Sequence, residues 1–191
     1  MKKTEKGEFG YLRYKKSLNL LIMIIAFVIV LAVFITGLII FKNKNNYMTL
    51  VAILLVLPAA KFAVAYFILI PHKCCDTKTM NDIKEVSGSL NVSYDMVVSN
   101  AKKPIGVLAA VISDNQILAY TEETKADKEL FETSVKEFMK NEKLNAAVLL
   151  YKDRESFLSK VKNTAANFDD TKETSLDRKG YLTEALLRMS L

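Results

Sequence analysis

The pattern of hydrophobic and polar residues divides the chain into two unlike parts. In the first part, residues 18–41 and residues 47–70 are two runs of almost entirely apolar side chains. A helix needs about 20 such residues to cross a hydrocarbon core about 30 Å thick. Only the short polar segment 42–46 separates the runs, which is enough to turn the chain but too little to form a domain. The pattern therefore predicts a transmembrane hairpin whose two ends lie on the same side of the membrane.

The rest of the chain, residues 71–191, has the pattern of a small α/β domain. Residues 78–88 predict a short helix. Apolar residues then alternate along residues 92–99, which is the period of a half-buried strand. A continuous apolar run at 105–112 and a further strand pattern at 116–121 are separated by a polar turn. We expect these last two segments to pair as a β-hairpin.

Helical and strand patterns alternate in the second half of this domain. Residues 125–141 carry an apolar stripe at helical spacing, and Thr124 with Asp127 three residues later resembles a capping box. Residues 145–151 predict a buried strand, after which Asp153 can cap another helix. Two strands joined by a crossover helix generally pair in parallel. The predicted fold is therefore a mixed four-stranded sheet with helices packed on it, in the order α-β-β-β-α-β-α.

The C-terminal part of the sequence returns to a helical pattern after a polar stretch. Residues 169–180 are polar and predict a loop. An amphipathic stripe follows, which either docks on the domain or is exposed for a partner. Its candidate contact residues are Tyr181, Leu182, Leu186 and Met189. The sequence thus predicts three parts: a basic cytoplasmic segment 1–17, the hairpin 18–70 and the domain 71–191.

Charge follows the same division. Residues 1–70 contain nine Lys or Arg and two Asp or Glu, a net charge of +7, whereas residues 71–191 contain 18 and 19, a net charge of −1. The basic character belongs to the membrane end, and it does not indicate nucleic-acid binding, which needs a basic face on the folded domain. Basic residues flanking the hairpin outnumber those in its turn. The positive-inside rule therefore places both termini in the cytoplasm of a multi-pass protein of the cell membrane.

Lys61 is the one charged residue inside either apolar run. An ionisable side chain at such depth costs about 3 kcal/mol or more, and is a candidate for function. Neither run contains an Asp or Glu that could neutralise it. Three roles are open to Lys61: it can extend toward the headgroups, contact a carboxylate or carbonyl of another chain, or line a wet path.

Few residues offer catalytic or metal-binding chemistry. The only histidine is His72, and the only cysteines are the adjacent Cys74 and Cys75. A single histidine at the membrane edge excludes a Ser-His-Asp triad in the domain and metal sites built from several histidines. One vicinal cysteine pair is neither a disulfide framework nor a metal site. The sequence has no glycine-rich phosphate loop, so we expect no cofactor, no metal and no catalytic residue.

The element order is similar to that of the restriction-endonuclease-like fold, whose core runs α-β-β-β-α-β. That family places an acid on the second strand and an acid-x-Lys sequence on the third, to hold a divalent metal and position a water molecule. Glu123-Thr124-Lys125 has this spacing at the end of the third predicted strand. No acid stands near Gly106, where the cross-hairpin partner belongs, and Asp114 falls in the turn. The resemblance implies a metal-dependent hydrolase, but with an incomplete set of acids.

The function expected from the sequence is therefore non-enzymatic. We expect the hairpin to anchor the domain in the lipid bilayer, and the domain or its C-terminal stripe to bind a protein, such as a transporter or a signalling component. A divergent metal-dependent hydrolase is one alternative. A homo-oligomeric conduit with Lys61 in its path is another, and it requires several copies because two helices are too few to enclose a pore.

Overall fold

The chain forms two compact units. The computed structural model describes residues 4–41, 47–99, 103–168 and 173–191. One unit is the helical hairpin Arg13–Pro71, and the other combines Met1–Leu12 with His72–Leu191. The α/β domain is therefore assembled from two separate stretches of the chain, with the hairpin between them in sequence.

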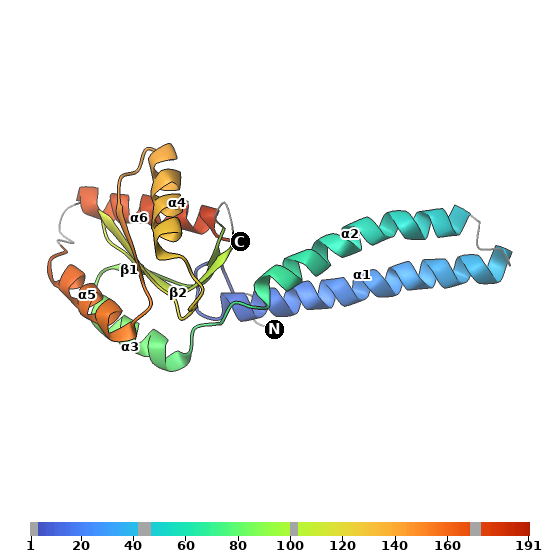
Figure 1. Ribbon diagram of the computed structural model, residues 1–191, viewed down its shortest axis with the longest axis horizontal. Coiled ribbons are helices and arrows are strands. Elements are labelled where there is room, and N and C mark those ends of the chain that lie inside the picture. Colours follow the sequence, from blue (N-terminus) through green and yellow to red (C-terminus); the bar gives the residue numbers. More distant parts are fainter. Residues whose placement is uncertain (1–3, 42–46, 100–102, 169–172) are drawn as a thin grey trace. The chain divides into compact units, whose positions relative to one another are not determined.

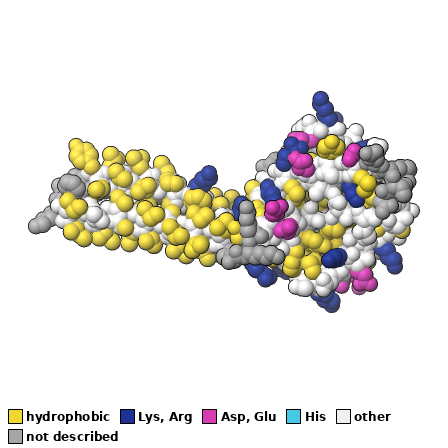
Figure 2. Space-filling view, turned by 180° about the vertical axis from the view of Figure 1, so that it is seen from behind, with side chains coloured by type: hydrophobic (Ala, Val, Ile, Leu, Met, Phe, Trp, Pro, Cys, Tyr) yellow, Lys and Arg dark blue, Asp and Glu magenta, His cyan; other side chains and the backbone are white. Residues whose placement is uncertain are grey.

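The hairpin unit consists of two long helices, α1 (Tyr11–Phe41) and α2 (Tyr47–Leu69). Both are long and apolar enough to cross a membrane. Figure 2 shows hydrophobic side chains gathered along both helices, whereas the domain surface mixes charged and apolar groups. Helix α1 begins at Tyr11 rather than at residue 18, because the apolar run marks only the part suited to lipid and the preceding polar residues are also tolerated in helices. The predicted turn at 42–46 lies outside the described residues.

A four-stranded sheet forms the centre of the domain. Its strands are β1 (Asn91–Val98), β2 (Ile105–Ile112), β3 (Gln116–Tyr120) and β4 (Ala147–Tyr151). They lie in the order β1-β2-β3-β4. Strand β2 is antiparallel to both β1 and β3, whereas β3 and β4 are parallel. The predicted mixed four-stranded sheet is confirmed, including the hairpin of β2 and β3 and the parallel pairing across the crossover helix.

Helices cover both faces of this sheet (Figure 1). Helices α4 (Lys128–Asn141) and α6 (Glu173–Met189) pack on one face, and α3 (Thr77–Ser87) and α5 (Arg154–Ala166) pack on the other. Each face has its own cluster of buried apolar side chains. Strand β2 is buried along its whole length, which explains why its sequence is continuously apolar rather than alternating.

Helix α6 differs from the loop predicted at residues 169–180. It begins at Glu173, so the loop prediction is wrong from that residue onward, while residues 169–172 lie outside the described part of the chain. The first turns of α6 are largely exposed and carry no apolar stripe that periodicity could detect. A tertiary contact also reaches this part of the helix, because Arg178 donates a hydrogen bond to the Asn145 carbonyl at 2.8 Å.

The outer edge of β1 is covered by an N-terminal and a C-terminal segment. The Tyr94 N–H donates to the Gly7 carbonyl at 2.7 Å, and the Leu191 N–H donates to the Val97 carbonyl at 2.8 Å. An open strand edge presents unpaired backbone groups with which other chains can pair. The two segments cover parts of this edge, and part of the predicted basic segment 1–17 therefore packs as a component of the domain.

Candidate functional site

Asp95 is a buried carboxylate in the middle of β1, with 1 % of the residue exposed. Its Oδ2 accepts a hydrogen bond from the Gly10 N–H and its Oδ1 accepts one from the Cys75 N–H, both at 2.6 Å. The backbone of Asp95 has a φ of 53°, a left-handed conformation that Asp tolerates better than most residues. This single carboxylate therefore binds two segments that lie on opposite sides of the hairpin in the sequence.

Glu123 forms a second cluster where β3 ends. Its Oε1 lies 2.6 Å from His72 Nδ1 and accepts a hydrogen bond from the Gly106 N–H at 3.1 Å. The Thr121 hydroxyl supports this arrangement, because it donates to the Gly106 carbonyl at 2.7 Å and accepts from the Glu123 N–H at 3.1 Å. A Cβ at Gly106 would overlap Glu123 Oε1 and stand 3.0 Å from His72 Nδ1, so the Glu123 carboxylate would have to move. His72, the first residue after the hairpin unit, is thus bound to the sheet.

The only candidate metal ligand in the Glu123-Thr124-Lys125 sequence is the Glu123 carboxylate, which already has hydrogen-bond partners. The Glu123 carboxylate faces Gly106 and His72, whereas Lys125 is exposed. Within the described residues, no three His, Cys, Asp or Glu side chains are grouped so that they could hold a metal ion. A site for Mg²⁺ or Ca²⁺ draws on several oxygen ligands. The geometry at Glu123 therefore favours a structural role in joining His72 to the sheet.

Cys75 lies beside Asp95 and behaves as a packed apolar residue. Burial, followed by the negative charges of Asp95, Asp76 and Glu122, raises the pKa of the Cys75 thiol to about 12. The thiolate is the reactive form of cysteine, so this thiol is almost entirely protonated at neutral pH. Cys74 is partly exposed, but the pair offers no activated nucleophile at Cys75.

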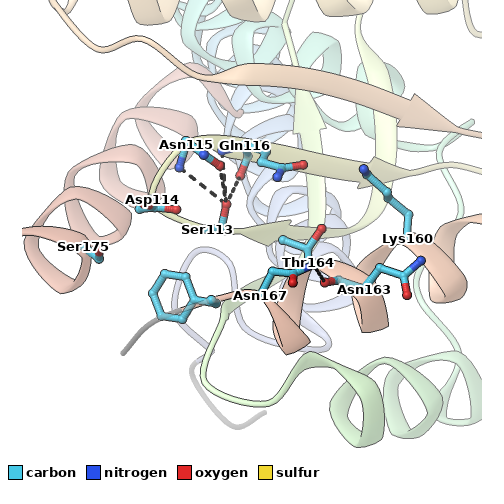
Figure 3. Close-up of a pocket in the computed structure, with 10 residues that line it drawn as sticks. Ser113, Asp114, Asn115, Gln116, Lys160, Asn163, Thr164, Asn167 and Ser175 are labelled. Carbon is cyan, nitrogen blue, oxygen red and sulfur yellow. Dashed lines mark hydrogen bonds between the residues drawn. The ribbon is translucent and has the colours of Figure 1, made fainter. Parts of the chain in front are cut away.

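A polar cavity of about 270 Å³ lies between the β2–β3 turn and the helices α5 and α6 (Figure 3). The Ser113 hydroxyl fixes this turn by accepting a hydrogen bond from the Gln116 N–H at 3.1 Å. Carboxamide side chains on the turn and on α5 can both donate and accept hydrogen bonds, and Lys160 and Asp114 add one positive and one negative charge. None of the residues that line the cavity is His or Cys. Its chemistry suits hydrogen bonding to a small polar molecule rather than nucleophilic catalysis.

The candidate contact residues of the C-terminal stripe fall into two groups. Leu182 and Leu186 are buried in the cluster between α4, α6 and the sheet, and Met189 packs partly buried against the same cluster. Tyr181 is 62 % exposed. Leu182, Leu186 and Met189 therefore dock the stripe on the domain, which is one of its two expected roles. Tyr181 is the candidate residue that remains accessible to a partner.

No local feature of the sequence singles out Asp95. It stands in a strand with alternating apolar positions, where an intervening polar residue usually faces solvent. Nothing local indicates that two backbone N–H groups, from residues distant in sequence, reach its carboxylate. The sequence indicates Glu123 only as part of an acid-x-Lys sequence. Its pairing with His72, like the contacts of Asp95, joins residues that are distant in the sequence.

The chain was compared with known protein families, proteins and structures. No protein-family model, no curated protein and no solved structure matches the sequence or the fold. The distinctive features of the chain are the two apolar helices, the two carboxylates that bind the segments flanking them, and the polar cavity.

Proposed function

We propose that this protein is a non-enzymatic accessory protein of the cell membrane, whose α/β domain binds a protein partner. In this proposal α1 and α2 span the bilayer, and the basic flanks keep both ends of the hairpin and the domain in the cytoplasm. The observation that carries the proposal is the pair of 2.6 Å hydrogen bonds that Asp95 accepts from Gly10 and Cys75. Both segments that lead into the hairpin are thereby bound to one strand of the domain.

These contacts leave almost no free chain between the hairpin unit and the sheet. Leu12 is buried and is followed directly by Arg13, where the hairpin unit begins. At the other end, Pro71 closes that unit and His72 already contacts Glu123. A flexible linker would allow a domain to range far from its anchor, and its reach would grow with its length. Two short connections limit that reach, which suits a subunit that works beside a membrane partner.

The orientation can be tested with a reporter. Residue 45 lies in the short segment between the two helices, where the proposal expects the cell exterior. Alkaline phosphatase fused at this position is expected to be active, and the same enzyme fused after residue 191 is expected to be inactive. The reversed pattern would place the domain outside and contradict the proposal.

The partner can be sought with the full-length chain carrying an affinity tag. Isolation from its native membrane in mild detergent is expected to recover a stoichiometric membrane protein. A flexible ten-residue insertion between Pro71 and His72 is expected to reduce this recovery, because it frees one of the two connections. The same insertion after residue 45 is the matched control and is expected to have no effect. Recovery of the chain alone would count against an accessory role.

The hydrolase alternative makes a different prediction about Glu123. An enzyme of that class would bind Mg²⁺ or Mn²⁺ at this carboxylate and would lose metal binding and hydrolysis in Glu123→Gln. The accessory function predicts no saturable metal binding by the wild-type chain. Isothermal titration of both proteins with each metal separates the two functions.

A further inference from the structure

Lys61 lies in the middle of an exposed apolar face of α2. Four apolar side chains share this face at spacings of three or four residues, and we call the set the Lys61 face: Leu54, Leu57, Lys61, Val64 and Ile68. Leu57 and Val64, one turn to either side of Lys61, are 70 % and 57 % exposed. Alternating spacings of three and four residues form the seam by which one helix packs along another.

The Lys61 face points away from α1. Ala59 is 0 % exposed, and Ala52 is also buried, so these small residues mark the side of α2 that turns toward α1 within the hairpin unit. Two residues further along a helix correspond to a rotation of about 200°. Lys61 therefore stands on the opposite side from Ala59, where lipid or another protein must cover it once the hairpin is in a bilayer.

The hairpin itself cannot neutralise the Lys61 ammonium group. Between Glu8 and Asp76 the sequence contains no Asp or Glu. The nearer end of α2 is Leu69, eight residues on, and at 1.5 Å per residue this is about 12 Å of helix, longer than an extended lysine side chain. Lysines at such depth usually pair with another group of the protein or of a partner.

We propose that the Lys61 face binds a transmembrane helix of a different protein, and that this helix carries an Asp or Glu at the level of Lys61. The inference rests on the proposed function, in which α2 spans the membrane, and it names the chemistry of the partner. A second copy of this chain does not meet the requirement, because it brings another lysine and no acid. The apolar residues on either side of Lys61 supply the packing surface, and the charge pair sets the register.

The test compares variants of the tagged full-length chain, isolated from the native membrane in mild detergent with bound proteins identified by mass spectrometry. The wild type and Lys61→Arg are expected to retain a protein that has an acid within a transmembrane segment. Lys61→Leu is expected to retain about tenfold less of it. Lys44→Leu, which removes a lysine outside the Lys61 face, is the matched control and is expected to behave as the wild type. Combining Lys61→Asp with a lysine in place of the partner's acid is expected to restore retention.

The possible failures are distinguishable. Equal retention by Lys61→Leu, or a partner without an acid in its membrane segments, overturns this inference, while the accessory function stands. Recovery of the chain alone overturns both. The phosphatase reporter at residue 45 identifies any variant that fails to insert, and Lys61→Arg provides a variant that keeps the charge.

Discussion

Asp95 is a charged side chain inside a small domain, and such a group is tolerated only where its hydrogen-bonding capacity is used. Both of its oxygens accept from backbone N–H groups, those of Gly10 and Cys75. Hydrogen bonds to a charged acceptor contribute roughly 1.5–3 kcal/mol each, and a buried donor left without its acceptor carries a similar penalty. One side chain therefore stabilises the attachment of two segments.

Replacing Asp95 by alanine is expected to lower the free energy of unfolding of the domain by about 3 kcal/mol or more. Asp95→Asn should lower it by less, because one amide oxygen can still accept a hydrogen bond. Pulse proteolysis of the full-length chain in detergent, across a urea gradient, measures both. Asp114→Ala, in the β2–β3 turn, is the control and should change the stability by less than about 0.5 kcal/mol. Equal stability of Asp95→Ala and this control would show that the two hydrogen bonds are dispensable.

Alanine substitutions at Gly106 and Gly180 are expected to have opposite effects on stability. A methyl group at Gly106 would displace Glu123 and His72, so Gly106→Ala is expected to destabilise the domain by about 1–3 kcal/mol. Gly180 lies within α6 with nothing near the position of a Cβ, so Gly180→Ala is expected to stabilise it by about 0.5–1 kcal/mol. The same proteolysis measurement compares the two. A neutral or stabilising effect of Gly106→Ala would contradict the contacts described at Gly106.

At the scale of whole elements, the starts of α4 and α5 show which helix caps local sequence can predict. Helix α5 begins after Asp153, whose carboxylate accepts a hydrogen bond from an N–H of the first turn, as predicted. Helix α4 begins at Lys128, and its cap is Asp127, which accepts from the Leu130 N–H at 3.1 Å. The prediction that Thr124 starts this helix is wrong. Two suitable capping residues stand three positions apart, and local sequence does not choose between them.

The cap of α4 can be tested by comparing substitutions at Asp127, the observed cap, and at Thr124, the predicted one. Asp127→Ala removes the acceptor for the Leu130 N–H and is expected to lower the stability of the domain by about 1 kcal/mol. Thr124→Ala should leave it within about 0.5 kcal/mol of the wild type. Urea midpoints of both variants decide between the observed and the predicted helix start. A larger effect at Thr124 than at Asp127 would favour the earlier start.

Apolar periodicity predicted the elements that bury a continuous or regularly spaced set of side chains. The sheet strands and the stripe of α4 belong to this class, and so does the pair of apolar helices. It did not predict the first turns of α6, which are exposed, or the pairing of Gly7 with Tyr94, which joins distant parts of the chain through backbone groups alone. The carboxylate contacts of Asp95 and Glu123 are of the same non-local kind.

For the molecule as a whole, the hairpin is an insertion into the sequence of the domain. Residues 13–71 form a unit of their own, and the domain is made from the segments on either side. The Gly10 and Cys75 nitrogens each lie 2.6 Å from an oxygen of one carboxylate, so the two segments come together at Asp95. A short link between them should therefore be able to replace the hairpin.

We expect a variant in which a Gly/Ser linker of about eight residues replaces residues 13–71 to be soluble and folded. A second variant that also lacks residues 1–12 loses the Gly10 hydrogen bond and the cover on part of β1. Its Tm is expected to be at least about 5 °C lower. Circular dichroism and size-exclusion chromatography check both. Equal Tm values would show that the N-terminal segment contributes little to the domain.

The cover on the edge of β1 also matters during synthesis. Gly7 is made before Tyr94 and is available to it at once, but the Leu191 N–H reaches the Val97 carbonyl only after the rest of the domain has been translated. At roughly 5–20 residues per second, the roughly 90 residues that follow β1 take on the order of 5–20 s to make. Throughout that interval part of β1 is open to pairing with a neighbouring nascent chain. The growing polypeptide on a crowded message is therefore the form of this protein most prone to aggregate.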